Sequence, residues 1–96
     1  MLEKIKLSMR IFHNVLDSDI KSNIDACMLD LQRVGVSKKH AGVTTTDALI
    51  YKAAELYCKW QSDFDSKADQ YQKAYEKLRD AISLCGTYAE SEDANV

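Results

Sequence analysis

The sequence predicts an all-α fold, a compact four-helix domain with a short first helix, three longer amphipathic helices and a flexible acidic C-terminal tail. Three observations lead to this prediction. Proline is absent and only three glycines occur in 96 residues, so few positions interrupt a helix. Apolar residues recur three and four positions apart in four separate stretches. The apolar fraction of 46% and the charged fraction of 29% are ordinary for one globular domain.

The first two helices are expected at about 2–10 and 17–34. Leu2, Ile5 and Met9 lie on one side of the first. Asp17 or Ser18 is a candidate N-cap of the second helix. The acidic residue that follows, Asp19, adds negative charge where the helix dipole favours it. The buried stripe of the second helix is expected to include Ile20, Ile24 and Leu31.

The end of the second helix is predicted by its sequence, "LQRVGV". Gly35 can take the left-handed conformation at low cost, and Val36 then falls where a Schellman motif packs an apolar residue against Leu31. The polar loop "SKKHAGVTTT" follows, and loops of this length in a small domain are often functional or disordered.

The third helix is expected at about 47–62, with Asp47 or Thr46 at its start. Its apolar face is unusually wide, which is typical of a central helix that touches several neighbours. The expected core positions of this helix are Leu49, Ala53, Tyr57 and Trp60, with Phe64 continuing the stripe.

The fourth helix is expected at about 67–84, where Ser66 and Asp69 resemble a capping box. Its core positions are expected to be Tyr71, Tyr75, Leu78 and Ile82. A helical domain over residues 1–86 would then be followed by an acidic tail over 87–96, "TYAESEDANV", whose composition is typical of disorder.

We find no constellation that predicts catalysis, a cofactor or a metal site. Cys27, Cys58 and Cys85 are far apart, without a CxxC pair, and are expected to be buried as small hydrophobic side chains. We interpret the two histidines as surface residues in preference to a metal site shared by His13, His40 and Cys27. No apolar run approaches the roughly 18 residues of a membrane span.

Several residues outside the stripes are candidates for contact with a partner. The loop residues Lys38, Lys39 and His40 are best interpreted as a solvated loop, with contact to an acidic partner or to DNA phosphates as the alternative. A net charge of -2 argues against a free-standing DNA binder. The remaining candidates, which lie off the stripes or in the tail, are Tyr51, Tyr88, Glu90 and Glu92.

Five segments follow one another along the chain: "KLSMRI", "LDSDI", "IDACMLDLQRVGV", "TDALIYKAAELYCKW" and "YQKAYEKLRDAI". Their order and spacing resemble the small tailed-phage and prophage head–tail connector family, also called DNA-packaging or head-completion proteins. The helix-boundary positions Asp17, Asp19, Gly35, Val36 and Asp47 match the family pattern one by one. Ala48 departs from it, because members often carry proline there.

The resemblance implies a non-enzymatic structural protein of the virion. Such proteins form a ring on the portal protein after packaging, extend the DNA channel and offer an attachment surface to stopper or tail-completion proteins, while DNA passes without sequence-specific binding. No membrane partner is implied. Two other interpretations remain open: a small helical partner-binding regulatory module of bacterial or prophage origin, and a nucleic-acid binder using Lys38, Lys39 and Arg33.

Overall fold

The computed structural model describes residues 1–11, 16–42 and 47–85. Four α-helices occur there: α1 (Leu2–Ser8), α2 (Asp17–Arg33), α3 (Ala48–Gln61) and α4 (Ala68–Ser83), with a short 3-10 turn, η1 (Phe64–Ser66), before α4. No strand occurs in these ranges, so the predicted all-α fold is confirmed. The acidic tail expected over 87–96 lies outside the described residues.

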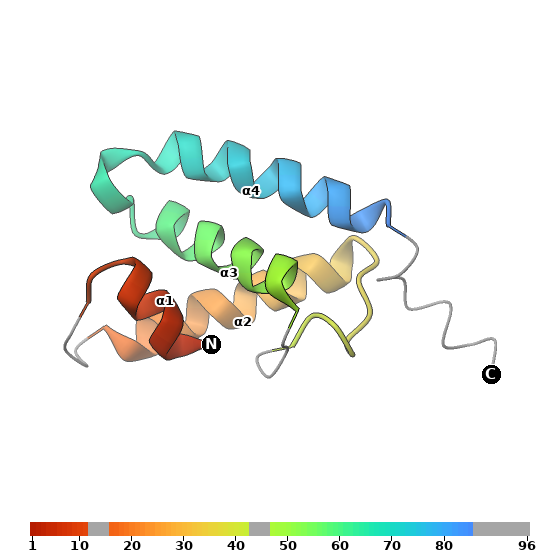
Figure 1. Cartoon of the computed structure of the whole chain (residues 1–96), viewed down its shortest axis with the longest axis horizontal. Helices are drawn as coiled ribbons and strands as arrows, with labels where there is room; N and C mark the ends of the chain where they lie inside the picture. The colour runs from red at the N-terminus through yellow and green to blue at the C-terminus, as the bar shows by residue number, and fades with distance from the viewer. Residues whose placement is uncertain (12–15, 43–46, 86–96) are drawn as a thin grey trace.

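Helix α3 is the centre of the fold, as the width of its apolar face predicted. It packs against α1, α2 and α4. Helices α2 and α4 run in the same direction on either side of it, and α3 runs the opposite way between them (Figure 1). Its inner face carries small side chains, because Ala53, Ala54 and Cys58 are fully buried beside Ile50. Small residues let neighbouring helices approach closely, so one helix can support the other three.

The buried core draws on all four helices and on the turn after α2. Six residues expected in the core are buried in the structure: Ile20, Ile24, Leu31, Ala53, Tyr75 and Ile82. Tyr57, Trp60 and Leu78 are half-buried against that core. Tyr71 is also half-buried, and its ring centroid lies 6.2 Å from that of Phe64.

One expected core residue is misplaced, because the side chain of Leu49 is 48% exposed while that of Ile50 is fully buried. The buried stripe of α3 is centred on Ile50, Ala54 and Cys58. At about 100° per residue, Leu49 lies about a third of a turn away from that centre. The expected stripe was therefore drawn too far toward one edge of the helix.

The end of α2 is the predicted Schellman motif. Gly35 has a φ of 107°. The N–H of Val36 donates to the carbonyl of Leu31 at 3.0 Å, and the N–H of Gly35 donates to Gln32 at 3.0 Å. Both Val36 and Leu31 are buried. Two carbonyls at the helix end are thereby satisfied while the chain turns back toward the core.

The start of α2 differs from the expectation of a side-chain cap. Leu16 occupies the N-cap position without a side-chain hydrogen bond, and Asp17 and Asp19 lie in the first turn. The carboxylate of Asp17 instead pairs with the Nζ atom of Lys6 at 2.8 Å. Lys6 is only 4% exposed. A buried ammonium needs a counter-charge, so Asp17 pairs with α1 instead of capping its own helix.

The expected N-terminal cap of α3 is correct, and the expected cap of α4 is wrong. Asp47 caps α3, because its Oδ1 accepts hydrogen bonds from the N–H groups of Leu49 at 2.9 Å and Ile50 at 3.2 Å. At α4 the expected Ser66 capping box is absent, since Lys67 is the N-cap and has no side-chain cap bond. Asp63 accepts the N–H of Ala68 at 3.1 Å in its place.

The loop after α2 is packed over its described part, 37–42. Ser37 and Ala41 are buried. The carbonyl of Ser37 accepts the N–H groups of His40 and Ala41, both at 2.9 Å. The side chain of Gln32 donates to the carbonyl of Ala41 at 3.0 Å. The first half of this segment is therefore a turn held against α2, and residues 43–46 lie outside the described ranges.

We expect Gly35→Ala to lower the free energy of unfolding by about 1 kcal/mol or more, because an L-residue resists positive φ. A Cβ at this position meets no atom within 4 Å, so backbone strain alone produces the loss. Urea unfolding measures the effect.

Gly42→Ala is the matched control. Its Cβ would lie 3.5 Å from the carbonyl oxygen of Lys38, an ordinary contact, and its φ is outside the left-handed range. Equal losses in the two variants would contradict the role given to Gly35.

Candidate interaction surface

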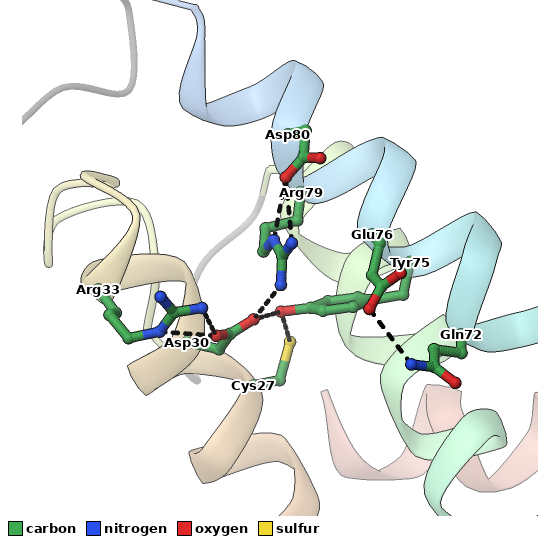
Figure 2. Close-up of polar contacts among 8 residues, drawn as sticks. All are labelled: Cys27, Asp30, Arg33, Gln72, Tyr75, Glu76, Arg79 and Asp80. Carbon is green, nitrogen blue, oxygen red and sulfur yellow. Dashed lines mark hydrogen bonds and ion pairs between the residues drawn. The ribbon is translucent and has the colours of Figure 1, made fainter.

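A polar cluster joins α2 to α4 across the face of α3 (Figure 2). The hydroxyl of Tyr75 donates to Oδ2 of Asp30 at 2.7 Å, and Nη1 of Arg79 reaches the same oxygen at 3.3 Å. The other oxygen, Oδ1, accepts from Nη2 of Arg33 at 2.6 Å. One carboxylate therefore binds donors from both outer helices. We call Cys27, Asp30, Arg33, Tyr75, Arg79 and Asp80 the Asp30 cluster.

Burial and hydrogen bonding together decide the protonation states of Asp30 and Tyr75. Burial raises the pKa of the Asp30 carboxyl, but hydrogen bonds from Tyr75, Arg33 and Arg79 outweigh that effect and hold the pKa below its ordinary value of 3.8. Burial and the neighbouring Cys27 raise the pKa of the Tyr75 hydroxyl. Asp30 is thus an anion and Tyr75 a neutral donor at physiological pH, which is the pairing that their 2.7 Å contact requires.

Aromatic rings from α3 support the same junction. The ring centroid of Tyr57 lies 5.2 Å from that of Tyr75 and 5.4 Å from that of Trp60, both in edge-to-face geometry. The guanidinium carbon of Arg79 lies 5.8 Å from the Tyr75 ring centroid. Such contacts add stability beyond simple area burial, and they fix the Tyr75 ring in its direction toward Asp30.

A groove of about 360 Å³ opens beside this cluster, between α2 and α4. Half-buried Tyr57 and Trp60 line it together with Leu29, whose side chain is 65% exposed. We call it the α2–α4 groove; its lining residues are Ala26, Leu29, Asp30, Arg33, Tyr57, Trp60 and Arg79.

The groove was missed in the sequence, where Tyr57 and Trp60 were expected in the core and Asp30 was not singled out. The placement of α4 relative to α2 creates the groove, and periodicity within one helix carries no information on that placement. Leu29 was the available signal, because it is a large apolar residue outside the buried stripe of α2.

The expected contact residues lie in several environments. Lys38 and Lys39 are exposed in the turn after α2, and His40 is half-buried there. Tyr51 is half-buried at the start of α3, with Nζ of Lys4 lying 5.6 Å from its ring centroid. It therefore pairs with α1. The three candidates in the tail, Tyr88, Glu90 and Glu92, lie outside the described residues.

Two of the three cysteines behave as expected. Cys27 and Cys58 are buried, and burial raises the pKa of each thiol to about 12. Thiols with such pKa values are poor nucleophiles at neutral pH. Cys85 is exposed, so its expected burial was wrong; it follows the last turn of α4, past the end of the buried stripe at Ile82.

The described part of the chain offers neither a metal cluster nor a membrane span. Within it no three His, Cys, Asp or Glu side chains are grouped to hold a metal ion. No helix there is long and apolar enough to cross a bilayer. His13, one member of the disfavoured metal set, lies outside the described ranges.

Tyr75→Phe removes the hydroxyl that joins α4 to Asp30. We expect it to lower the free energy of unfolding by about 1–2 kcal/mol, the usual range for losing a hydrogen bond to a charged group. Tyr71→Phe is the matched control, because the Tyr71 ring contacts Phe64 and Lys59 and lies outside the cluster. Urea unfolding measures the loss of stability in both variants. Equal losses would contradict the role given to the Tyr75 hydroxyl.

The lowered pKa of Asp30 predicts an acid-dependent part of the stability. A carboxyl whose pKa is lower in the folded state stabilises the protein above its unfolded pKa, and this contribution is lost as pH falls through the folded value. The stability difference between wild type and Asp30→Asn should therefore be largest at pH 7 and shrink below about pH 4.

Urea unfolding at several pH values between 7 and 3 measures that difference. Asp25→Asn is the control, since it removes a charge from the exposed face of the same helix. A difference between wild type and Asp30→Asn that stays constant over this range would contradict the role of the charged carboxylate.

Comparison with known proteins provides the family of this chain. No curated protein and no solved structure matches it significantly. A family model described as "Phage connector protein" matches residues 1–89, which is nearly the whole sequence. The match includes all four helices, the Asp30 cluster and the α2–α4 groove. The chain therefore belongs to the phage connector protein family.

Proposed function

We propose that this chain is a subunit of the head–tail connector of a tailed phage or prophage. In this role it forms a ring with copies of itself on the portal protein, extends the DNA channel and presents a surface to stopper or tail-completion proteins of the virion. The observation that carries the proposal is the family match over residues 1–89.

A ring places a strict demand on subunit shape. Each subunit in a ring presents two different faces to its neighbours, and the ring closes only if the angle between these faces is fixed. A small angular error in one subunit would be repeated at every contact. The Asp30 cluster supports such rigidity, because it ties α2 and α4 together on opposite sides of α3.

The charge of the chain fits a channel component that lets DNA pass. A net charge of -2 gives no overall attraction to the phosphate backbone. The exposed Lys38 and Lys39 are then local contacts, and we propose them, with His40 and Tyr51, as contacts to the portal or to the neighbouring subunit. Tyr88, Glu90 and Glu92 remain candidate contacts in a separate tail over 87–96.

The experiment is the native mass by light scattering, first of the protein alone and then with its portal protein. We expect a closed multi-subunit species in at least one of the two conditions. A monomer or dimer that ignores the portal would contradict the connector role and would favour a small regulatory binding module.

A charge-reversal pair tests the proposed contacts. Lys38→Glu with Lys39→Glu should weaken assembly on the portal, whereas Lys73→Glu with Lys77→Glu, two exposed lysines of α4, is the control. Equal assembly by both double variants would exclude the loop lysines from the interface.

A further inference from the structure

We propose that the α2–α4 groove is the docking site for the C-terminal segment of the same subunit, residues 86–96. The groove presents an arginine from each outer helix and an aromatic surface from α3. Its occupant should therefore be a short acidic segment that carries an aromatic or small apolar residue. The segment that follows α4 has this composition.

The chain leaves α4 at the correct place for this contact. Arg79 lies one turn before the end of α4 at Ser83, and the description ends at Cys85. Because α2 and α4 run in the same direction, their C-terminal ends lie on the same side of the molecule (Figure 1). The segment therefore starts beside the end of the groove that carries Arg33 and Arg79.

The length of the segment is sufficient. Eleven residues follow Cys85, and an extended chain of that length spans up to about 36 Å. One helical turn is about 5.4 Å, so the segment can return past Arg79 and reach Trp60 with residues to spare. A tethered segment also has an effective local concentration in the millimolar range, so even weak contacts keep it docked.

Charge complementarity favours this occupant. The segment contains Glu90, Glu92 and Asp93 and has no lysine or arginine. The two arginines of the groove already pair with two aspartates, Asp30 in its lining and Asp80 beside it, so the attraction for an acidic segment comes from the exposed part of the Arg33 guanidinium. Arg79 is engaged by both Asp30 and Asp80. The side chain of Arg33 is 65% exposed and bound on one side by Asp30, so it is the principal anchor for a carboxylate.

The apolar part of the groove matches the segment as well. Leu29 is exposed at one side, and the rings of Tyr57 and Trp60 lie half-buried. The segment carries Tyr88 and Ala89 near its start. A tyrosine can cover exposed apolar surface while its hydroxyl stays in water, which suits a shallow, partly wet groove.

The protein contains a reporter for this contact, because Trp60 is its single tryptophan and lines the groove. The experiment compares acrylamide quenching of Trp60 fluorescence in the full chain and in a chain that ends at Cys85. We expect the full chain to show a quenching constant lower by roughly twofold or more, since a docked tether covers the ring for most of the time. Equal quenching would overturn the proposal.

Charge variants test whether the groove arginine recognises the carboxylates of the segment. Arg33→Gln, and separately Glu90→Gln with Glu92→Gln, should raise quenching toward that of the shortened chain. Lys21→Gln is the matched control, because it removes an exposed positive charge from α2 outside the groove. Protection that survives all the charge variants would overturn the proposed recognition.

A mixing experiment distinguishes the subunit's own segment from that of a neighbour. The shortened chain is mixed with a full-length Trp60→Phe chain, which carries the segment but gives no tryptophan signal. Unchanged quenching of the shortened chain is expected. Protection in this mixture would mean that the segment docks on another copy, and it would overturn the proposal. The result does not depend on ring formation, which light scattering measures separately.

Discussion

The burial of α3 on several sides is the constraint on which the rest of this structure depends. Its small inner residues allow α1, α2 and α4 to pack directly against one helix. Each outer helix then needs only one apolar face, and its other face stays polar or half-exposed. This explains how the described part of so short a chain forms a buried core and still presents separate outer surfaces on α2 and α4.

The Asp30 cluster fixes the angle between α2 and α4, which their packing on α3 leaves loosely defined. Helices that pack on a shared neighbour without packing on each other have little to fix their relative angle. Tyr75 and Arg79 reach from α4 to one carboxylate of α2, and directional hydrogen bonds supply the angle that apolar packing leaves free. The groove beside the cluster is a consequence, because the helices are joined by long side chains and their backbones stay apart.

The sequence predicted those features whose causes are local. Gly35 and Asp47 mark helix ends through their own backbone and side-chain chemistry, so both were identified correctly. Asp17 and Ser66 were misassigned because tertiary neighbours decide their roles: the buried Lys6 pairs with Asp17, and Asp63 binds the first amide of α4. Leu49 and the groove were missed for the same reason, since both depend on where other helices lie.

If the chain assembles as proposed, the position of the groove would link folding to assembly. Leu29 and Arg33 lie on the outer surface of α2. A neighbouring subunit could also contact this exposed apolar side chain and the exposed part of this guanidinium. One surface cannot hold the subunit's own segment and a neighbour at the same time. If the ring contact uses this face, assembly must displace the segment, and the energy of docking opposes premature association. If the ring contact uses other faces, a docked segment would instead cover an apolar surface that could bind other proteins nonspecifically. In both cases an occupied groove would determine which faces of a free subunit are available to its partners.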